Sequence, residues 1–181
     1  MIALGTKLET YSDYLKKTEE GNFQLIGGQI TARTSPSAIH QEVLLNLVFA
    51  IRNFLTKNKS GKVFVAPLDV YFSETEVYQP DIFVLLNSSF SKLKENMVEG
   101  APDLILEVLS PSTAYYDLKH KKNIYEKSSV KEYWVVDPIA KTLEIFQNRN
   151  NKFQLSSELK ETGIAKSVLL ENLEIDLASV F

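Results

Sequence analysis

Apolar side chains recur at helical spacing in one long segment of the chain. Between Ala38 and about Lys57 they fall on a single stripe, formed by Val43, Leu44, Leu47, Val48, Ile51 and Leu55. Such a stripe predicts an amphipathic helix with one face in the core. The preceding Ser35-Pro36-Ser37 breaks the chain and can cap that helix. Residues 10–20 show the same i, i+3, i+4 spacing over a shorter length and predict another helix.

Shorter apolar runs, bounded by turn residues, predict strands. Residues 23–34 predict an N-terminal hairpin around Gly27-Gly28, and residues 143–157 predict a C-terminal hairpin around 148–151. Single strands are predicted over 62–66, 68–73, 81–86, 103–109 and 132–136. A helix is predicted from about Thr113 to Ser128, a polar loop over 87–102, and short elements over 167–181. This order predicts an α/β fold with a mixed central sheet flanked by helices.

Composition narrows the classes of function. The chain has 181 residues without an internal repeat or linker, which predicts a single domain over 1–181. It has no cysteine, which excludes disulfides, thiolate metal ligands and a cysteine nucleophile. Its net charge is −3, so any contact with nucleic acid would need a local basic patch. The N-terminus lacks a signal-peptide pattern, and no apolar run reaches the ~18–20 residues of a membrane span. We therefore expect a cytoplasmic protein that does not cross a membrane.

Two carboxylates interrupt the predicted strands. Glu107 lies within the continuous apolar run 104–109, which is typical of a strand buried on both faces. A carboxylate there is costly unless it is paired, hydrogen-bonded or metal-bound, so we favour a functional role for Glu107. Asp81 lies at the start of a similar run, where a structural role at the strand end is an equal alternative. If their strands are neighbours, the two acids can share a site whose oxygen ligands suit Mg²⁺ or Mn²⁺.

The predicted helix that follows Glu107 supplies a cation. Asp117, Lys121 and Tyr125 recur every four residues and therefore share one helical face. The structural alternative is an exposed Asp117–Lys121 pair, which would contribute only ~0.2–0.5 kcal/mol to the helix. In the functional interpretation, Lys121 reaches the two carboxylates, where it orients a water or stabilises charge on a phosphoryl oxygen.

Together these motifs resemble those of a known family. The strings QPD at 79–81, APDLILEVLSPST at 101–113 and VKEYWVVDP at 130–138 are similar to those of the Uma-type family of restriction-endonuclease-like proteins. The spacing of Asp117, Lys121 and Tyr125, the string SPSAIHQ at 35–41 and the C-terminal stretch 169–181 are similar too. The resemblance covers nearly the whole chain. Each string is weak alone, whereas their common order and spacing are specific.

This family is placed in the PD-(D/E)XK nuclease superfamily, and the resemblance implies the αβββαβ core of that superfamily. It also implies a Mg²⁺ or Mn²⁺ ion held by Asp81, Glu107 and the carbonyl of Val108. The superfamily usually has a lysine two residues after the glutamate, where this chain has Leu109. In the Uma-type branch the lysine lies on the following helix, which points to Lys121 as the catalytic cation.

The activity implied by the resemblance is hydrolysis of phosphodiester bonds in nucleic acid, with DNA favoured, by a magnesium-dependent endonuclease. Secondary candidates for the site are His40, Glu42, Asp117 and Tyr125. For His40 and Glu42, a helix residue without a metal role is the structural alternative. A competing function is a catalytically silent nucleic-acid-binding or regulatory module, which Leu109 and the acidic net charge favour. A small-molecule enzyme that uses the same acids is a third hypothesis. A homodimer is compatible with each of them.

Overall fold

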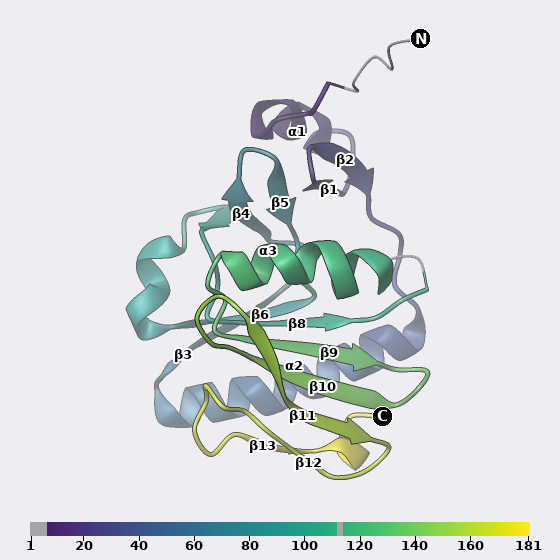
Figure 1. Cartoon of the computed structure of the whole chain (residues 1–181), viewed down its shortest axis with the longest axis vertical. Coiled ribbons are helices and arrows are strands. Elements are labelled where there is room, and N and C mark those ends of the chain that lie inside the picture. Colours follow the sequence, from purple (N-terminus) through teal and green to yellow (C-terminus); the bar gives the residue numbers. More distant parts are fainter. Residues whose placement is uncertain (1–6, 112–113) are drawn as a thin grey trace.

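The computed structural model describes residues 7–111 and 114–181, which form two main sheets (Figure 1). The larger sheet has six strands in the order β11-β10-β9-β8-β6-β3. They are β3 (Gly61–Val65), β6 (Ile82–Leu86), β8 (Leu104–Val108), β9 (Glu132–Asp137), β10 (Thr142–Asn148) and β11 (Phe153–Lys160). β8 and β9 are parallel, whereas the other neighbouring pairs are antiparallel. The prediction of a mixed sheet is therefore confirmed.

The smaller sheet lies toward the N-terminal end of the molecule and has five strands in the order β2-β1-β5-β4-β7 (Figure 1). They are β1 (Phe23–Ile26), β2 (Gln29–Ala32), β4 (Asp69–Ser73), β5 (Glu76–Tyr78) and β7 (Met97–Glu99). Helix α1 (Tyr11–Thr18) packs on this sheet through Tyr14, which is buried with Leu25 and Val77. At the C-terminal end, β12 (Ile164–Lys166) pairs with β13 (Glu174–Asp176), and the 3₁₀ turn η3 (Leu177–Ser179) follows.

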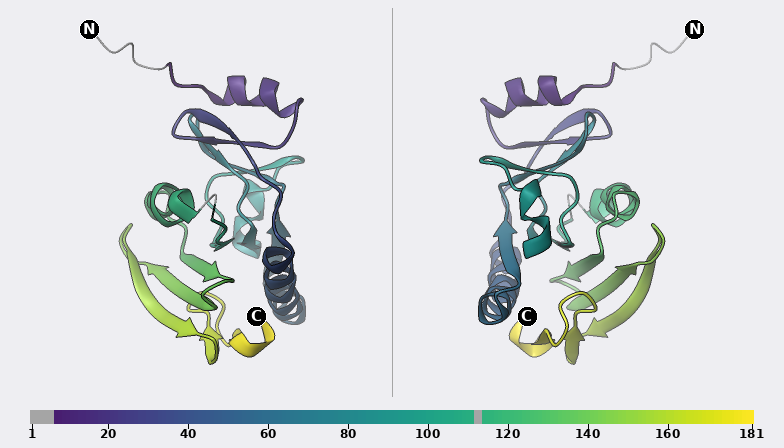
Figure 2. Two further views of the ribbon diagram at one scale, coloured as in Figure 1. Left: turned by 90° about the vertical axis from the view of Figure 1, so that its right-hand side faces the viewer. Right: turned by 90° about the vertical axis from the view of Figure 1, so that its left-hand side faces the viewer.

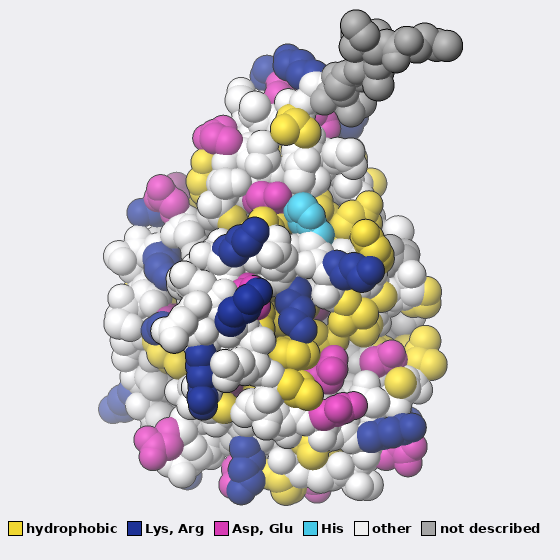
Figure 3. All heavy atoms as spheres, viewed as in Figure 1, with side chains coloured by type: hydrophobic (Ala, Val, Ile, Leu, Met, Phe, Trp, Pro, Cys, Tyr) yellow, Lys and Arg dark blue, Asp and Glu magenta, His cyan; other side chains and the backbone are white. Residues whose placement is uncertain are grey.

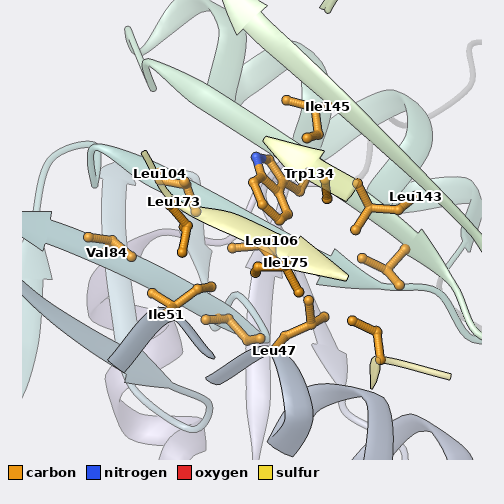
Figure 4. Close-up of a cluster of buried hydrophobic side chains, with 14 of the residues drawn as sticks. Leu47, Ile51, Val84, Leu104, Leu106, Trp134, Leu143, Ile145, Leu173 and Ile175 are labelled. Atoms are coloured by element: carbon orange, nitrogen blue, oxygen red, sulfur yellow. The ribbon is translucent and has the colours of Figure 1, made fainter. Parts of the chain in front are cut away.

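Helices cover both faces of the larger sheet (Figures 1 and 2). Helix α2 (Ala38–Asn58) lies on one face, and the π-helix η2 (Tyr116–Lys121) with α3 (Lys122–Lys127) lies on the other. Side chains of a strand alternate between these layers, so Val84 packs in the cluster under α2 and Phe83 in the cluster under α3. Figure 4 shows the first cluster, where Leu47 and Ile51 of α2 approach Leu106. No helix in the two described ranges is long and apolar enough to cross a membrane.

The element order gives the predicted core. In chain order, α2, β3, β6, β8, α3 and β9 form the αβββαβ arrangement, with all four strands in the larger sheet. The hairpin β4–β5 interrupts this order and joins the smaller sheet. Both predicted terminal hairpins are present, as β1–β2 and β10–β11. The fold prediction is therefore confirmed.

Three details differ from the sequence-based prediction. The predicted loop 87–102 contains the 3₁₀ helix η1 (Asn87–Lys92) and β7, because Val98 is buried beside β4. Strand β5 escapes prediction because three residues are too few to show an alternation. The helix predicted from Thr113 adopts π geometry over 116–121 before it continues as α3, and Thr113 itself lies outside the described residues.

A buried carboxylate fastens the C-terminal segment to the larger sheet. Glu132 of β9 is fully buried, and its carboxylate accepts hydrogen bonds from Trp134 Nε1 at 2.5 Å and Ser167 Oγ at 2.9 Å. It also accepts from the N–H groups of Val168 at 2.8 Å and Leu169 at 2.6 Å. Four donors therefore depend on this one side chain.

We expect Glu132→Ala to lower the free energy of unfolding by about 2–5 kcal/mol, because its buried donors would lose their acceptor. Urea denaturation followed by tryptophan fluorescence measures this change. Glu158→Ala is the matched control, since Glu158 is exposed on β11. A loss of stability for Glu132→Ala no larger than that of the control would contradict a structural role for these hydrogen bonds.

Candidate active site

Asp81 and Glu107 face each other across two neighbouring strands. Asp81 immediately precedes β6, whose Ile82 pairs with Leu106 of β8, so the antiparallel register places Asp81 opposite Glu107. The Asp81 N–H donates to Glu107 Oε2 at 3.2 Å, and the Val108 N–H donates to Asp81 Oδ2 at 3.0 Å. Both residues are nearly enclosed, with exposures of 6% for Asp81 and 1% for Glu107. The strand register thus brings two of the predicted site residues together.

The helical layer surrounds the Glu107 carboxylate with three polar side chains. Lys121 Nζ lies 3.2 Å from Glu107 Oε1, and the Tyr125 hydroxyl donates to the same oxygen at 2.6 Å. Lys121 also forms an ion pair with Asp117 Oδ1 at 2.8 Å, so its ammonium bridges two buried carboxylates. Asp117 and Lys121 belong to η2, and short π-helical segments occur frequently at functional sites.

The Asp81 carboxylate receives its partners from the N-terminal third of the chain. Arg33 Nη2 donates to Asp81 Oδ1 at 3.1 Å, and Arg33 Nη1 donates to the Gln79 carbonyl. His40 Nε2 lies 3.3 Å from Asp81 Oδ2. His40 is in the first turn of α2, where its N–H donates to the capping side chain of Ser37 at 3.3 Å. The start of α2 therefore positions His40 against the site.

The two central acids differ in their ionisation. Burial raises the pKa of Glu107 to about 7, against the lowering effect of Lys121. Burial also acts to raise the pKa of Asp81, but the His40 hydrogen bond and neighbouring positive charges bring it below its usual value. The hydrogen bond to Asp81 in turn raises the pKa of His40. One carboxyl group is therefore ionised at neutral pH while the other titrates there, a separation typical of acid–base pairs.

The donor atoms of this cluster suit a hard divalent cation. Asp81 and Glu107 supply carboxylate oxygens, and Val108, whose N–H donates to Asp81 Oδ2, lies beside them. Within residues 7–111 and 114–181, no three histidine, cysteine, aspartate or glutamate side chains converge as a preformed metal cage. Mg²⁺ needs no such cage, because it keeps several waters and binds through one or two carboxylates. The oxygen donors therefore fit Mg²⁺ or Mn²⁺ better than zinc.

A second acid–histidine pair lies on the other side of η2. His120 Nε2 is 3.1 Å from Glu76 Oε1. The Glu76 carboxylate also accepts hydrogen bonds from the Gly27 N–H at 2.9 Å and from the Tyr78 hydroxyl. Glu76 and Tyr78 belong to β5, and Gly27 to the turn between β1 and β2. His120 thus fastens η2 to the smaller sheet, while the adjacent Lys121 points into the site.

The other predicted site residues fall into two groups, those that lie in the cluster and one that does not. His40, Asp117 and Tyr125 lie in the cluster, whereas Glu42 is exposed on α2. Residues two apart on a helix point in different directions, so His40 and Glu42 cannot both face the site. Arg33 is a site residue that the sequence analysis missed. It lies one residue after a short strand, and no local pattern indicates that its side chain turns toward Asp81.

Comparisons with known proteins identify the family of this chain. The chain matches the model of the Uma2 family, described as "Putative restriction endonuclease", over residues 8–178. An uncharacterised protein of Synechocystis sp. is 27% identical over 163 residues, which cover 88% of this chain and 92% of that protein. The crystal structure of a putative nuclease belonging to DUF820, from Anabaena variabilis, has a TM-score of 0.77 at 19% identity. That likeness covers 95% of this chain and 97% of the other, and it shows a shared fold. Since the family model spans nearly the whole sequence, the chain belongs to the Uma2 family.

Proposed function

We propose that this protein is a metal-dependent nuclease that hydrolyses phosphodiester bonds in nucleic acid, with DNA as the favoured substrate. The observation that carries the proposal is the convergence of Asp81, Glu107 and Lys121 in one buried cluster. The family description and the fold of the Anabaena protein support a nuclease-like function. Because a fold alone does not determine an activity, the roles of the residues depend on the chemistry of the site.

The two acids have separate roles in this proposal. A divalent cation at their oxygens would supply an activated water and neutralise charge on the scissile phosphate. The lowered pKa of Asp81 keeps its carboxylate ionised at neutral pH, so it provides a constant negative charge. Glu107 has a pKa of about 7 in the cation-free site, so it loses its proton near neutral pH and its oxygens then become available to the cation. The Tyr125 hydroxyl holds Glu107 Oε1 in place.

Lys121 supplies a fixed positive charge. Burial acts to lower its pKa, but the carboxylates of Glu107 and Asp117 outweigh burial and raise it, so the ammonium stays protonated. Donors held in place before the reaction stabilise developing charge without the cost of reorganisation. Lys121 would therefore stabilise negative charge on a phosphoryl oxygen, although Leu109 stands where the superfamily has its usual lysine.

A local basic surface is consistent with a polyanionic substrate. Lysine and arginine side chains gather over α3 on the face shown in Figure 3. The segment η2–α3 itself carries Lys119, Lys122 and Lys127 outside the buried cluster. Attraction of a phosphate backbone depends on such local potential more than on net charge. The chain therefore combines an acidic total charge with a basic face next to the proposed site.

The proposal is tested with Asp81→Asn, which keeps the size of the side chain and removes its charge. We expect Mn²⁺ affinity, measured by calorimetry, to fall roughly 10- to 100-fold, and Mn²⁺-dependent cleavage of DNA to be lost. Glu42→Gln is the matched control, because Glu42 is an exposed acid on α2. Equal Mn²⁺ affinity in Asp81→Asn and the control would contradict the metal site. Asp81-dependent Mn²⁺ binding without cleavage of DNA or RNA would favour the silent binding module.

A further inference from the structure

We infer that Arg33 is a phosphate-binding residue, which holds Asp81 in the cation-free site and turns to the nucleic-acid backbone in the loaded site. This inference rests on the proposed nuclease function and adds to it the residue that couples cation binding to substrate binding.

Arg33 is the most accessible cation in contact with the two acids. Its side chain is 20% exposed, compared with 8% for His40 and 5% for Lys121. Lys121 is held by two carboxylates, whereas Arg33 contacts one carboxylate, Asp81, and the Gln79 carbonyl. Of the three basic side chains, Arg33 is therefore the most accessible to a ligand that arrives from solvent.

The backbone at Arg33 can stay in place while the side chain moves. The Arg33 N–H donates to the Asn22 carbonyl at 3.0 Å, which closes the base of the β1–β2 hairpin. Residues 34–39, which follow, are exposed before His40 becomes buried. A change of side-chain rotamer, without a change of fold, is thus sufficient to carry the guanidinium away from Asp81.

The charge balance of the cluster explains why the Arg33 side chain would turn from Asp81 to a phosphate. When ionised, Asp81, Glu107 and Asp117 carry three negative charges, and Arg33 and Lys121 offset two of them. A divalent cation bound at the same carboxylates would leave the cluster net positive, even with His40 neutral. Excess charge in an enclosed site is costly unless an anion joins it. The loaded cluster is therefore complementary to a phosphodiester, which carries one negative charge.

The Arg33 guanidinium is suited to bind both the Asp81 carboxylate and a phosphate. Its planar set of donors binds carboxylates and phosphates with the same geometry. Asp81 Oδ1 now occupies one of these donors, and a cation on that oxygen would compete with Arg33 for it. Released from Asp81, the same donors match the non-bridging oxygens of a backbone phosphate beside the site.

The experiment compares wild type, Arg33→Gln and Arg33→Lys by two binding measurements. Calorimetry with Mn²⁺ alone should show about 2- to 5-fold tighter binding in Arg33→Gln, because a competing cation is gone. Fluorescence anisotropy with a short DNA duplex and Ca²⁺ should show roughly 10-fold or more weaker binding in Arg33→Gln. Without divalent cations, duplex affinity should change little, because Arg33 is then engaged with Asp81. Arg33→Lys should recover part of the duplex affinity.

Arg52→Gln is the matched control, because Arg52 is exposed on α2 and also loses one positive charge. Equal weakening of duplex binding with and without Ca²⁺ would show that Arg33 is an ordinary surface cation and overturn the inference. Unchanged or weaker Mn²⁺ binding in Arg33→Gln would overturn it as well. Thermal unfolding of each variant checks that the fold is retained.

The failure of this inference is distinguishable from failure of the proposed function. If the wild-type protein binds Mn²⁺ through Asp81 and cleaves DNA while Arg33→Gln behaves as the Arg52→Gln control, only the role of Arg33 is wrong. If wild-type protein shows no Asp81-dependent Mn²⁺ binding, the proposed function fails, and the coupling assigned to Arg33 fails with it.

Discussion

Replacing Lys121 by alanine should lower the free energy of unfolding by about 3–5 kcal/mol, because two buried carboxylates would lose their counter-charge. Lys121 Nζ lies 3.2 Å from Glu107 and 2.8 Å from Asp117, and all three side chains are at most 5% exposed. Removal of one partner from a buried ionic cluster costs more than the cluster itself contributes. Urea denaturation of the cation-free protein measures the change.

Two comparisons distinguish the loss of the buried counter-charge from a general effect of removing a lysine. Lys119→Ala, on the same π-helix but exposed, should change stability by no more than ~0.5 kcal/mol. Mn²⁺ should stabilise Lys121→Ala more than wild type, since a cation held by Glu107 restores part of the missing charge. Cleavage should stay absent in Lys121→Ala even at Mn²⁺ concentrations that restore its stability. If Lys121→Ala and Lys119→Ala have equal stability and equal cleavage, Lys121 is only a surface ion-pair residue and the proposed role is wrong.

The second large effect is on the pH dependence of cation binding. The pKa of Glu107 is raised to about 7 by burial, so protons compete for its oxygens at neutral pH. We expect Mn²⁺ affinity to be nearly constant above pH 7 and to fall by up to about tenfold per pH unit below it. Asp81 does not contribute to the pH dependence of Mn²⁺ affinity near neutral pH, because its pKa is lowered and it is already ionised there. Calorimetric titrations from pH 5 to 8 measure the profile.

Glu107→Gln provides the control for this profile. Its Mn²⁺ affinity should be weak and nearly independent of pH over the same interval, because the titrating ligand is absent. A wild-type affinity that stays constant from neutral to mildly acidic pH would argue against Glu107 as a ligand.

Folding stability of the cation-free protein should depend on pH in the opposite direction to Mn²⁺ affinity. The pKa of Glu107 is about 7 in the folded protein and 4.5 ordinarily, so wild type should lose stability relative to Glu107→Gln as pH rises from 4.5 to 7.

Much of the fold follows from periodicity alone. The stripe on α2 and the apolar runs of β6 and β8 are long enough to fix element type, and the order of the elements predicts a mixed sheet flanked by helices. The αβββαβ core itself is implied by the family resemblance. Glu107 is conspicuous because it interrupts a run of otherwise buried apolar residues. Once β6 and β8 are neighbours, register alone places Asp81 opposite Glu107. These inferences need only local patterns and one pairing of strands.

Other parts of the site depend on contacts that no local pattern encodes. Arg33 reaches Asp81 across 48 positions of sequence, and His120 reaches Glu76 across 44. The sequence of η2 has the spacing of an ordinary α-helix, and no residue in it signals the π geometry. The spacing of Asp117 and Lys121 does not reveal that Lys121 is buried, and its enclosure by two acids changes its expected contribution to stability. Tertiary distances, and not residue types, decide these features.

The contact between His120 and the first hairpin ties together two regions that would otherwise vary independently in evolution. Gly27 has a φ of +58°, and a Cβ atom there would lie 3.2 Å from His120 Cε1. A larger residue in this turn would therefore press on the ring whose neighbour in sequence is Lys121. Descendants of this chain that replace Gly27 should also replace His120, so that covariation between the two positions would record the mechanical link between the hairpin and the lysine.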